Sequence, residues 1–132
     1  MSLPLNNTEA RAIIEQALDA GINYFDTADL YEKGKNEEMI GQILKPYREK
    51  IILATKVGNR FTEGQASWTW DPSRAHILKS VKDSLRRLQT DTIDLYQLHG
   101  GTLEDNLDEV IDTFEELKKN GYIREYGISS IR

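Results

Sequence analysis

The stretch Ile51-Ile52-Leu53-Ala54-Thr55-Lys56 decides the fold, because a near-continuous apolar run is typical of a parallel strand covered on both faces. It ends in an amine, and two other short runs also end in polar residues: Asn23-Tyr24-Phe25-Asp26 and Ile93-Asp94-Leu95-Tyr96-Gln97-Leu98-His99. Tyr31 lies five residues past Asp26, in the loop that follows. In a (β/α) barrel, side chains from the C-terminal ends of the strands converge on one site. The sequence therefore predicts an α/β chain of the TIM-type (β/α) barrel class, with a shared site at the strand ends.

Helical and strand patterns alternate along the chain in four α-then-β units, each of the size expected for a crossover in a parallel sheet. Strands are expected over residues 22–26, 51–57, 92–98 and 122–129, and residues 58–70 are expected to be irregular. Caps and apolar spacing indicate the helices. Thr8 and Gly21 bound the first helix, and the second covers residues 36–44. The third helix starts at Asp71-Pro72 and is expected to bury Leu78, Val81, Leu85 and Leu88, and the fourth is expected to bury Leu103, Leu107, Val110, Phe114 and Leu117. No linker divides the pattern, so residues 1–132 are expected to form a single partial-barrel domain.

Composition excludes several classes of function. The net charge of −5 and the pI near 5.1 argue against nucleic-acid and anionic-membrane partners. The sequence has no cysteine, so thiolate catalysis and disulfides are excluded, and with His76 and His99 as the only histidines no metal site is expected. The N-terminus lacks the basic and apolar regions of a signal peptide and no apolar run is long enough to span a bilayer, so a cytoplasmic location is expected.

The strand-end residues and Tyr31 form a coherent set for reducing a carbonyl group. A phenol with a pKa of about 10 is a poor acid at neutral pH unless a cation lies beside it. Tyr31 would be the acid, Lys56 the cation that modulates it, and Asp26 the ion-pair partner that holds Lys56. His99 would donate a hydrogen bond to the carbonyl oxygen and orient it.

Each of these residues also has a structural interpretation when it is taken alone. Asp26 is then a helix cap or surface carboxylate, Lys56 a solvated amine, and His99 a hydrogen-bonded structural histidine. His76, inside a helix of ordinary spacing, is interpreted as structural. Asp94 lies inside a strand, where a buried carboxylate needs a partner that the sequence does not name.

The segment between the second strand and the third helix carries three aromatic residues, Phe61, Trp68 and Trp70. Loops that follow barrel strands build binding sites, so these residues either wall a substrate pocket or pack the loop onto the top of the barrel. Both interpretations stay open. The charged runs at 33–38 and 115–119 are interpreted as solvated helix surface.

Several separated segments, in order, resemble the signatures of the aldo-keto reductases. They are Phe25-Asp26-Thr27-Ala28-Asp29-Leu30-Tyr31 with Asn36-Glu37-Glu38-Met39-Ile40-Gly41, then Ala54-Thr55-Lys56, Asp94-Leu95-Tyr96-Gln97-Leu98-His99, and Gly121-Tyr122-Ile123-Arg124-Glu125-Tyr126-Gly127-Ile128-Ser129-Ser130. The resemblance implies that Tyr31, Asp26, Lys56 and His99 correspond to the family's catalytic tetrad. It also implies an eight-stranded barrel that reduces aldehydes or ketones with NADPH, less often with NADH.

The resemblance further implies where the cofactor binds. Ser129 matches the family serine that contacts the nicotinamide carboxamide, and Ser130 stands where asparagine is usual. Asp26 is the third residue assigned to the cofactor site. Glu32 stands where the family has a glycine after the tyrosine, within a loop of slightly different length, which affects the shape of the pocket.

A family barrel needs roughly 250 residues or more, about twice the length of this chain. We therefore expect a truncated or split reductase that supplies strands two to five of the barrel and self-associates through its exposed strand edges. The small-molecule partner would be a carbonyl substrate. The alternatives are a nucleotide-sensing or regulatory module of the same fold, which would bind cofactor without turnover, and a catalytically silent fragment, which would not bind it.

Overall fold

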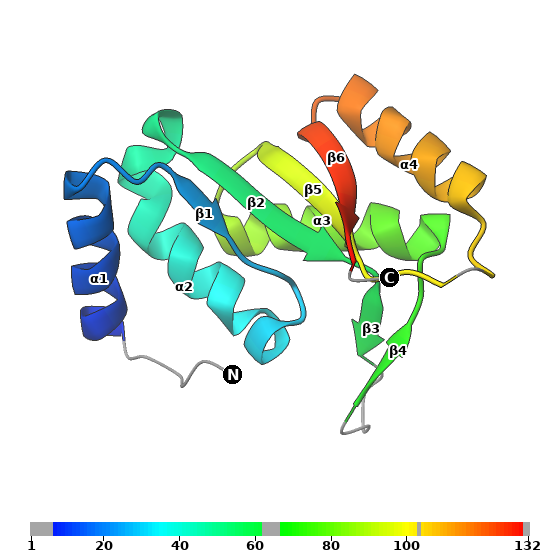
Figure 1. Ribbon diagram of the computed structural model, residues 1–132, viewed down its shortest axis with the longest axis horizontal. Helices are drawn as coiled ribbons and strands as arrows, with labels where there is room; N and C mark the ends of the chain where they lie inside the picture. The colour runs from blue at the N-terminus through cyan, green and yellow to red at the C-terminus, as the bar shows by residue number, and fades with distance from the viewer. Residues whose placement is uncertain (1–6, 62–66, 103, 131–132) are drawn as a thin grey trace.

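A parallel sheet organises the computed structural model, which describes residues 7–61, 67–102 and 104–130. The sheet has the strand order β1-β2-β5-β6, and every neighbouring pair is parallel (Figure 1). Its strands are β1 (Tyr24–Asp26), β2 (Ile52–Val57), β5 (Ile93–His99) and β6 (Ile123–Ser129). Because each strand follows a helix in the chain, the prediction of four α-then-β units is confirmed.

The helices pack against one face of this sheet and leave the other face to the site. They are α1 (Asn7–Asp19), α2 (Lys35–Leu44), α3 (Arg74–Leu88) and α4 (Leu107–Lys119), with 3₁₀ turns η1 (Tyr31–Gly34) and η2 (Lys45–Lys50) around α2. The core joins apolar residues of α3 and α4 to alternate residues of the strands, including Leu53, Val57, Tyr96 and Leu98. None of the helices in the described part of the chain is both long and apolar enough to cross a membrane.

Strand register decides which side chains face away from the helices. Asp26 pairs with Ala54, and Lys56 pairs with Gln97. Since successive side chains alternate between faces, Asp26, Lys56 and His99 share the face opposite Leu53 and Tyr96. The second strand is covered on both faces only from Leu53 onward, because Ile52 is 44% exposed.

The segment expected to be irregular contains an antiparallel hairpin, so that expectation was wrong. It comprises β3 (Asn59–Phe61) and β4 (Trp68–Trp70), joined through residues outside the described part, and Figure 1 shows it extending from the end of β2. Phe61 and Trp68 face each other across the two strands, with ring centroids 5.6 Å apart. Cross-strand aromatic pairs of this kind stabilise short strands that an alternating apolar pattern in the sequence would not predict.

The starts of helices α1 and α3 differ from the sequence expectation. Helix α1 begins at Asn7, so Thr8 lies inside it. The cap of α3 is Ser73, whose side chain accepts a hydrogen bond from the backbone N–H of His76, while Asp71 accepts one from the backbone N–H of Ser73. Asn106 caps α4 in the same way. Of the residues that α4 was expected to bury, Leu103 lies outside the described residues and Leu107 is exposed, so the prediction for Leu107 was wrong. Polar residues stand close together at each start, so sequence alone does not choose among them.

Asp94, whose partner the sequence did not name, is a structural carboxylate. Its Oδ2 atom lies 2.8 Å from Arg48 Nη1, and its Oδ1 atom lies 3.1 Å from Arg124 Nε. The backbone N–H of Leu53 also donates to Oδ2. The carboxylate therefore ties the starts of β2 and β6 to β5.

Candidate active site

Lys56 is the centre of the candidate site, and its ammonium is almost completely buried. Its side chain is 5% exposed, and Nζ lies 2.7 Å from Asp26 Oδ2 at the end of the neighbouring strand. Nζ also donates to the backbone carbonyl of Thr27 at 2.9 Å. A buried ammonium without such partners would be costly. The ion pair therefore fixes the position of Lys56 Nζ at the end of β2, and Asp26 is the partner that the sequence predicted for it.

Tyr31 reaches the same ammonium from η1. Its ring centroid lies 5.6 Å from Lys56 Nζ, and its side chain is half-exposed. The two residues that follow, Glu32 and Lys33, have φ values of 52° and 55°. This left-handed region favours glycine and costs other residues roughly 1 kcal/mol or more. Glu32 thus adopts a glycine-like conformation at the position where a glycine was expected.

His99 ends β5 and meets Tyr31 edge to face, with ring centroids 5.9 Å apart and an interplanar angle of 88°. Its Nδ1 atom is buried and has no hydrogen-bond partner within the described part of the chain. Burial lowers the pKa of His99, the charge of Lys56 lowers it further, and Asp26 opposes both effects. The imidazole is therefore neutral at pH 7, so it acts as a hydrogen-bonding group and not as a cation.

A cavity of about 540 Å³ opens beside His99, lined by the ends of β5 and β6 and by the hairpin. Its lining residues are Trp70, His99, Gly100, Gly101, Thr102, Ser129 and Ser130. Ser129 pairs with His99 in the sheet, so both predicted serines open into the same space as the imidazole. Of the three aromatic residues considered for a pocket, Trp70 is the one that lines this cavity.

Phe61 and Trp68 lie elsewhere on the hairpin. They pack on each other, and Lys33 Nζ lies 5.7 Å from the centroid of the Phe61 ring. Trp68 is 49% exposed, and Phe61 lines a smaller cleft together with Lys33 and His76. Neither Phe61 nor Trp68 lines the cavity beside His99, so their place in a substrate pocket stays a prediction.

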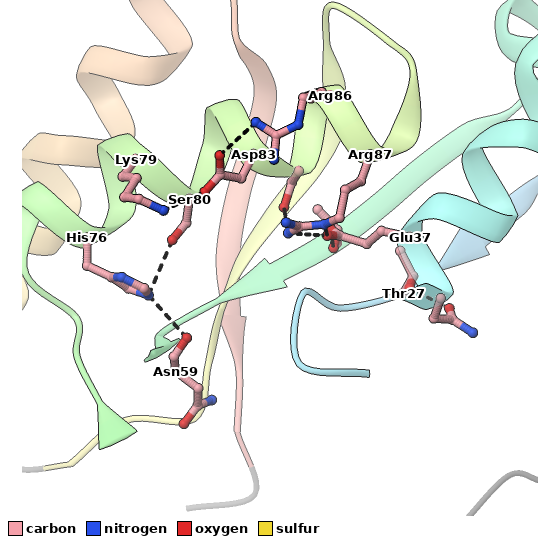
Figure 2. A network of polar contacts seen from close by, with 12 residues as sticks. Thr27, Glu37, Asn59, His76, Lys79, Ser80, Asp83, Arg86 and Arg87 are labelled. Carbon is pink, nitrogen blue, oxygen red and sulfur yellow. Dashed lines mark hydrogen bonds and ion pairs between the residues drawn. The ribbon is translucent and has the colours of Figure 1, made fainter. Parts of the chain in front are cut away.

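A buried ion pair that the sequence did not reveal joins α2 to α3. Glu37 was interpreted as part of a solvated charged run, and this was wrong because the residue is fully buried. Its Oε1 atom lies 2.6 Å from Arg87 Nη2 and 2.7 Å from Arg87 Nε (Figure 2). Thr55 Oγ1 donates to Oε2 at 2.6 Å. The available signal was position, since Glu37 shares the inner face of α2 with Gly41 and Leu44.

Asp29 adds a second acid to this region. Its Oδ1 atom is buried and has no hydrogen-bond partner in the described residues. Burial and the neighbouring charge of Glu37 raise the pKa of Asp29 to about 7, although Arg87 opposes them. Asp29 lies two residues before Tyr31, so a group that titrates near neutrality sits at the base of the loop that carries the phenol.

His76 has the structural role expected of it. Its Nε2 atom lies 3.1 Å from the carbonyl oxygen of Asn59 and 3.2 Å from Ser80 Oγ, so it joins α3 to the hairpin (Figure 2). Burial lowers the pKa of His76, while Asp71 raises it. Among residues 7–61, 67–102 and 104–130, no group of three or more histidine or acidic side chains is placed to hold a metal ion.

The chain matches known proteins along its whole length. The model of the aldo/keto reductase family matches residues 2–132. The oxidoreductase YqkF of Bacillus subtilis is 59% identical over 132 residues, which are all of this chain and 43% of that protein. The holo form of aldo-keto reductase AKR11C1 from Bacillus halodurans has a TM-score of 0.95 at 63% identity, covering 99% of this chain and 44% of its own. An aldo/keto reductase from Klebsiella pneumoniae, in complex with NADP and acetate, has a TM-score of 0.80 at 31% identity, covering 92% and 39%.

These similarities confirm the predicted fold class, since the solved neighbours are TIM barrels and the sheet of this chain matches part of one. The chain spans less than half the length of the relatives it matches. It belongs to the aldo/keto reductase family.

Proposed function

We propose that the chain carries the proton-transfer centre of an NADPH-dependent reductase that converts aldehydes or ketones to alcohols. The observation that supports this most directly is the Lys56 ammonium, which lies between the carboxylate of Asp26 and the ring of Tyr31. NADPH, or less often NADH, would supply the hydride to the carbonyl carbon. The two solved relatives named above, one in its holo form and one in complex with NADP and acetate, favour a nicotinamide cofactor.

The residues of the chain would divide the remaining work. Tyr31 would donate its hydroxyl proton to the carbonyl oxygen as the negative charge develops there. Lys56 lies close enough to stabilise the phenolate that remains, and Asp26 keeps Lys56 in place. His99, neutral at pH 7, would donate a hydrogen bond to the same oxygen and fix its direction.

The residues present fit the nicotinamide end of the cofactor. Ser129 and Ser130 open into the cavity beside His99, and their hydroxyl groups have the donor and acceptor chemistry that a carboxamide needs. Asp26 completes the assigned set at the end of β1. These three residues are therefore proposed to hold the nicotinamide.

The proposed reaction is tested first by binding and then by turnover. An NADPH titration of the purified chain, followed through Trp68 and Trp70 fluorescence, should show saturable binding, and turnover of simple aldehydes should follow. Binding without turnover would favour the nucleotide-sensing alternative. If the chain shows no NADPH binding and no turnover, the proposed function of this chain is contradicted.

The outer strands favour self-association as the state in which the site is complete. Strands β1 and β6 lie at the two edges of the sheet, and their large apolar residues Tyr24 and Ile128 are 45% and 55% exposed. Unpaired edges with apolar side chains promote association. Sedimentation at micromolar concentration should therefore show a dimer or larger species, and a monodisperse monomer would contradict this. The cytoplasmic location and the absence of a nucleic-acid partner stay predictions.

A further inference from the structure

Trp70, the last residue of β4, lies across two loops that leave the C-terminal ends of the sheet strands. A Cβ atom on Gly58 would lie 2.5 Å from Trp70 Cζ3, and one on Gly100 would lie 3.5 Å from the same atom. Gly58 follows β2, and Gly100 follows His99. Both have φ above 110°, where glycine is favoured. The indole therefore leaves no room for a side chain at Gly58, and it lies at ordinary contact distance from the position of a Cβ atom at Gly100.

One carboxylate holds the other side of the indole. Trp70 Nε1 donates to Asp105 Oδ1 at 3.0 Å and lies 3.3 Å from Oδ2. The same carboxylate accepts the backbone N–H of Thr102 at 2.7 Å and the hydroxyl of Thr102 at 3.0 Å. Asp105 thus joins the hairpin to the loop after β5, although it lies 35 residues from Trp70 in the chain.

We infer that Asp105 is a positioning residue, which fixes the indole of Trp70 as the wall of the cavity beside His99. The inference rests on the proposed function in one respect, because the wall selects substrates only if carbonyl compounds bind in that cavity. The geometry itself is independent of any ligand. Without the carboxylate, the indole N–H loses its acceptor, and the partly buried ring loses the hydrogen bond that holds it over the two glycines.

An amide at position 105 cannot replace the carboxylate. Oδ2 receives the backbone N–H of Thr102 and Oδ1 receives its hydroxyl, while Trp70 Nε1 lies within reach of both oxygens. An asparagine has one oxygen and one NH₂ group, so it would place a donor against Thr102 N–H or against the indole. Asp105→Asn should therefore weaken the hold on Trp70 while changing the shape of the side chain very little.

The test follows Trp70 by itself. The chain has two tryptophans, so in a Trp68→Phe background Trp70 is the single indole, and acrylamide quenching and anisotropy of its emission report its position. Asp105→Asn should shift the ratio of seated to released indole by about tenfold toward release, which raises quenching and lowers anisotropy. Asp112→Asn is the matched control, because it removes the same charge from an exposed position on α4.

A second variant approaches the indole from the opposite side. Gly58→Ala inserts a methyl group into the space now filled by the ring and should release Trp70 with Asp105 intact. Circular dichroism confirms that each variant is folded at the assay temperature. If Asp105→Asn quenches like Asp112→Asn, or if Gly58→Ala leaves quenching unchanged, the inference is overturned.

Kinetics then separate this inference from the proposed function. In aldehyde turnover, Asp105→Asn should raise KM while kcat changes by less than about threefold, because the residue shapes binding and touches no reacting atom. An equal loss in kcat and kcat/KM would overturn the positioning role. Absence of turnover in every form, the unmodified chain included, would contradict the proposed function, whereas the quenching result still decides whether Asp105 positions Trp70.

Discussion

Replacing Arg87 by methionine should destabilise the chain through Glu37, whose charge would lose its partner inside the fold. Glu37 is fully buried, and the Arg87 side chain is 17% exposed. Removing one partner of a buried ion pair costs about 3 to 5 kcal/mol, because the remaining charge is left without compensation. The guanidinium keeps some contact with water, so we expect the lower end, about 3 kcal/mol. With a urea m-value of about 1.5 to 2 kcal/mol/M, the unfolding midpoint should fall by about 1.5 to 2 M.

Urea unfolding at pH 6, followed by circular dichroism, isolates this charge. Asp29 has a pKa of about 7, so at pH 6 it is mostly protonated and adds little repulsion. Arg86→Met is the matched control, since the Arg86 side chain is 72% exposed and forms a surface ion pair with Asp83. Exposed pairs are worth up to about 1 kcal/mol, so this variant should lose much less.

A double-mutant cycle assigns the loss to the pair. Glu37→Gln keeps an oxygen for the Thr55 hydroxyl and removes the charge, so the double variant with Arg87→Met should regain about 2 kcal/mol over Arg87→Met alone. If Arg87→Met loses less than about 1 kcal/mol, or if the two substitutions are additive, the argument that Glu37 depends on Arg87 is refuted.

Four further predictions concern the site. In an active assembly, Tyr31→Phe should lower kcat at least roughly 100-fold, and a change below about threefold would remove the phenol from the acid role. Burial and Glu37 raise the pKa of Asp29 to about 7, so between about pH 4 and 7 the folded state holds a proton that the unfolded state has released. The free energy of unfolding should therefore fall by up to about 1.4 kcal/mol per pH unit in this range. Asp29→Asn should abolish that slope in urea titrations. Burial raises the pKa of Asp105, but hydrogen bonds from Thr102 and Trp70 outweigh burial and hold the pKa below its ordinary value. Acrylamide quenching of Trp70 should therefore stay constant down to about pH 4 and rise only at lower pH. Trp68→Ala should leave the substrate KM unchanged, because the side chain does not line the cavity beside His99, and a large increase in KM would assign Trp68 to the substrate pocket.

The parallel sheet and the strand-end cluster were predictable because the sheet follows from the pattern of apolar residues and the cluster follows from the positions of polar residues at the strand ends. The apolar run of β2 and the acidic, basic and imidazole ends of three strands are local signals, and parallel pairing brings them to one edge. The hairpin β3–β4 was missed because its stability comes from Phe61 and Trp68 meeting across strands, a contact that no residue announces by itself.

The buried ion pair was missed for a related reason. A glutamate among charged neighbours is usually solvated, and only the approach of α3 turns Glu37 inward, toward an arginine 50 residues away. The same holds for Asp105, which looks like an ordinary residue before a helix until the hairpin brings Trp70 to it. Properties that arise when distant segments meet are therefore the part that sequence patterns do not carry.

The candidate site and the buried ion pair meet β2 at neighbouring residues that face opposite sides of the sheet. Thr55 faces the helices and donates to Glu37, while Lys56 faces the opposite side and binds Asp26. Because side chains alternate along a strand, any shift of β2 that relaxes the Glu37 pair also moves the ammonium beside Tyr31. Arg87 should for this reason act on the site through backbone position, so Arg87→Met in an active assembly should lower kcat even under conditions where the variant stays folded. Unchanged kcat in a folded, destabilised variant would show instead that β2 is held by its sheet neighbours alone.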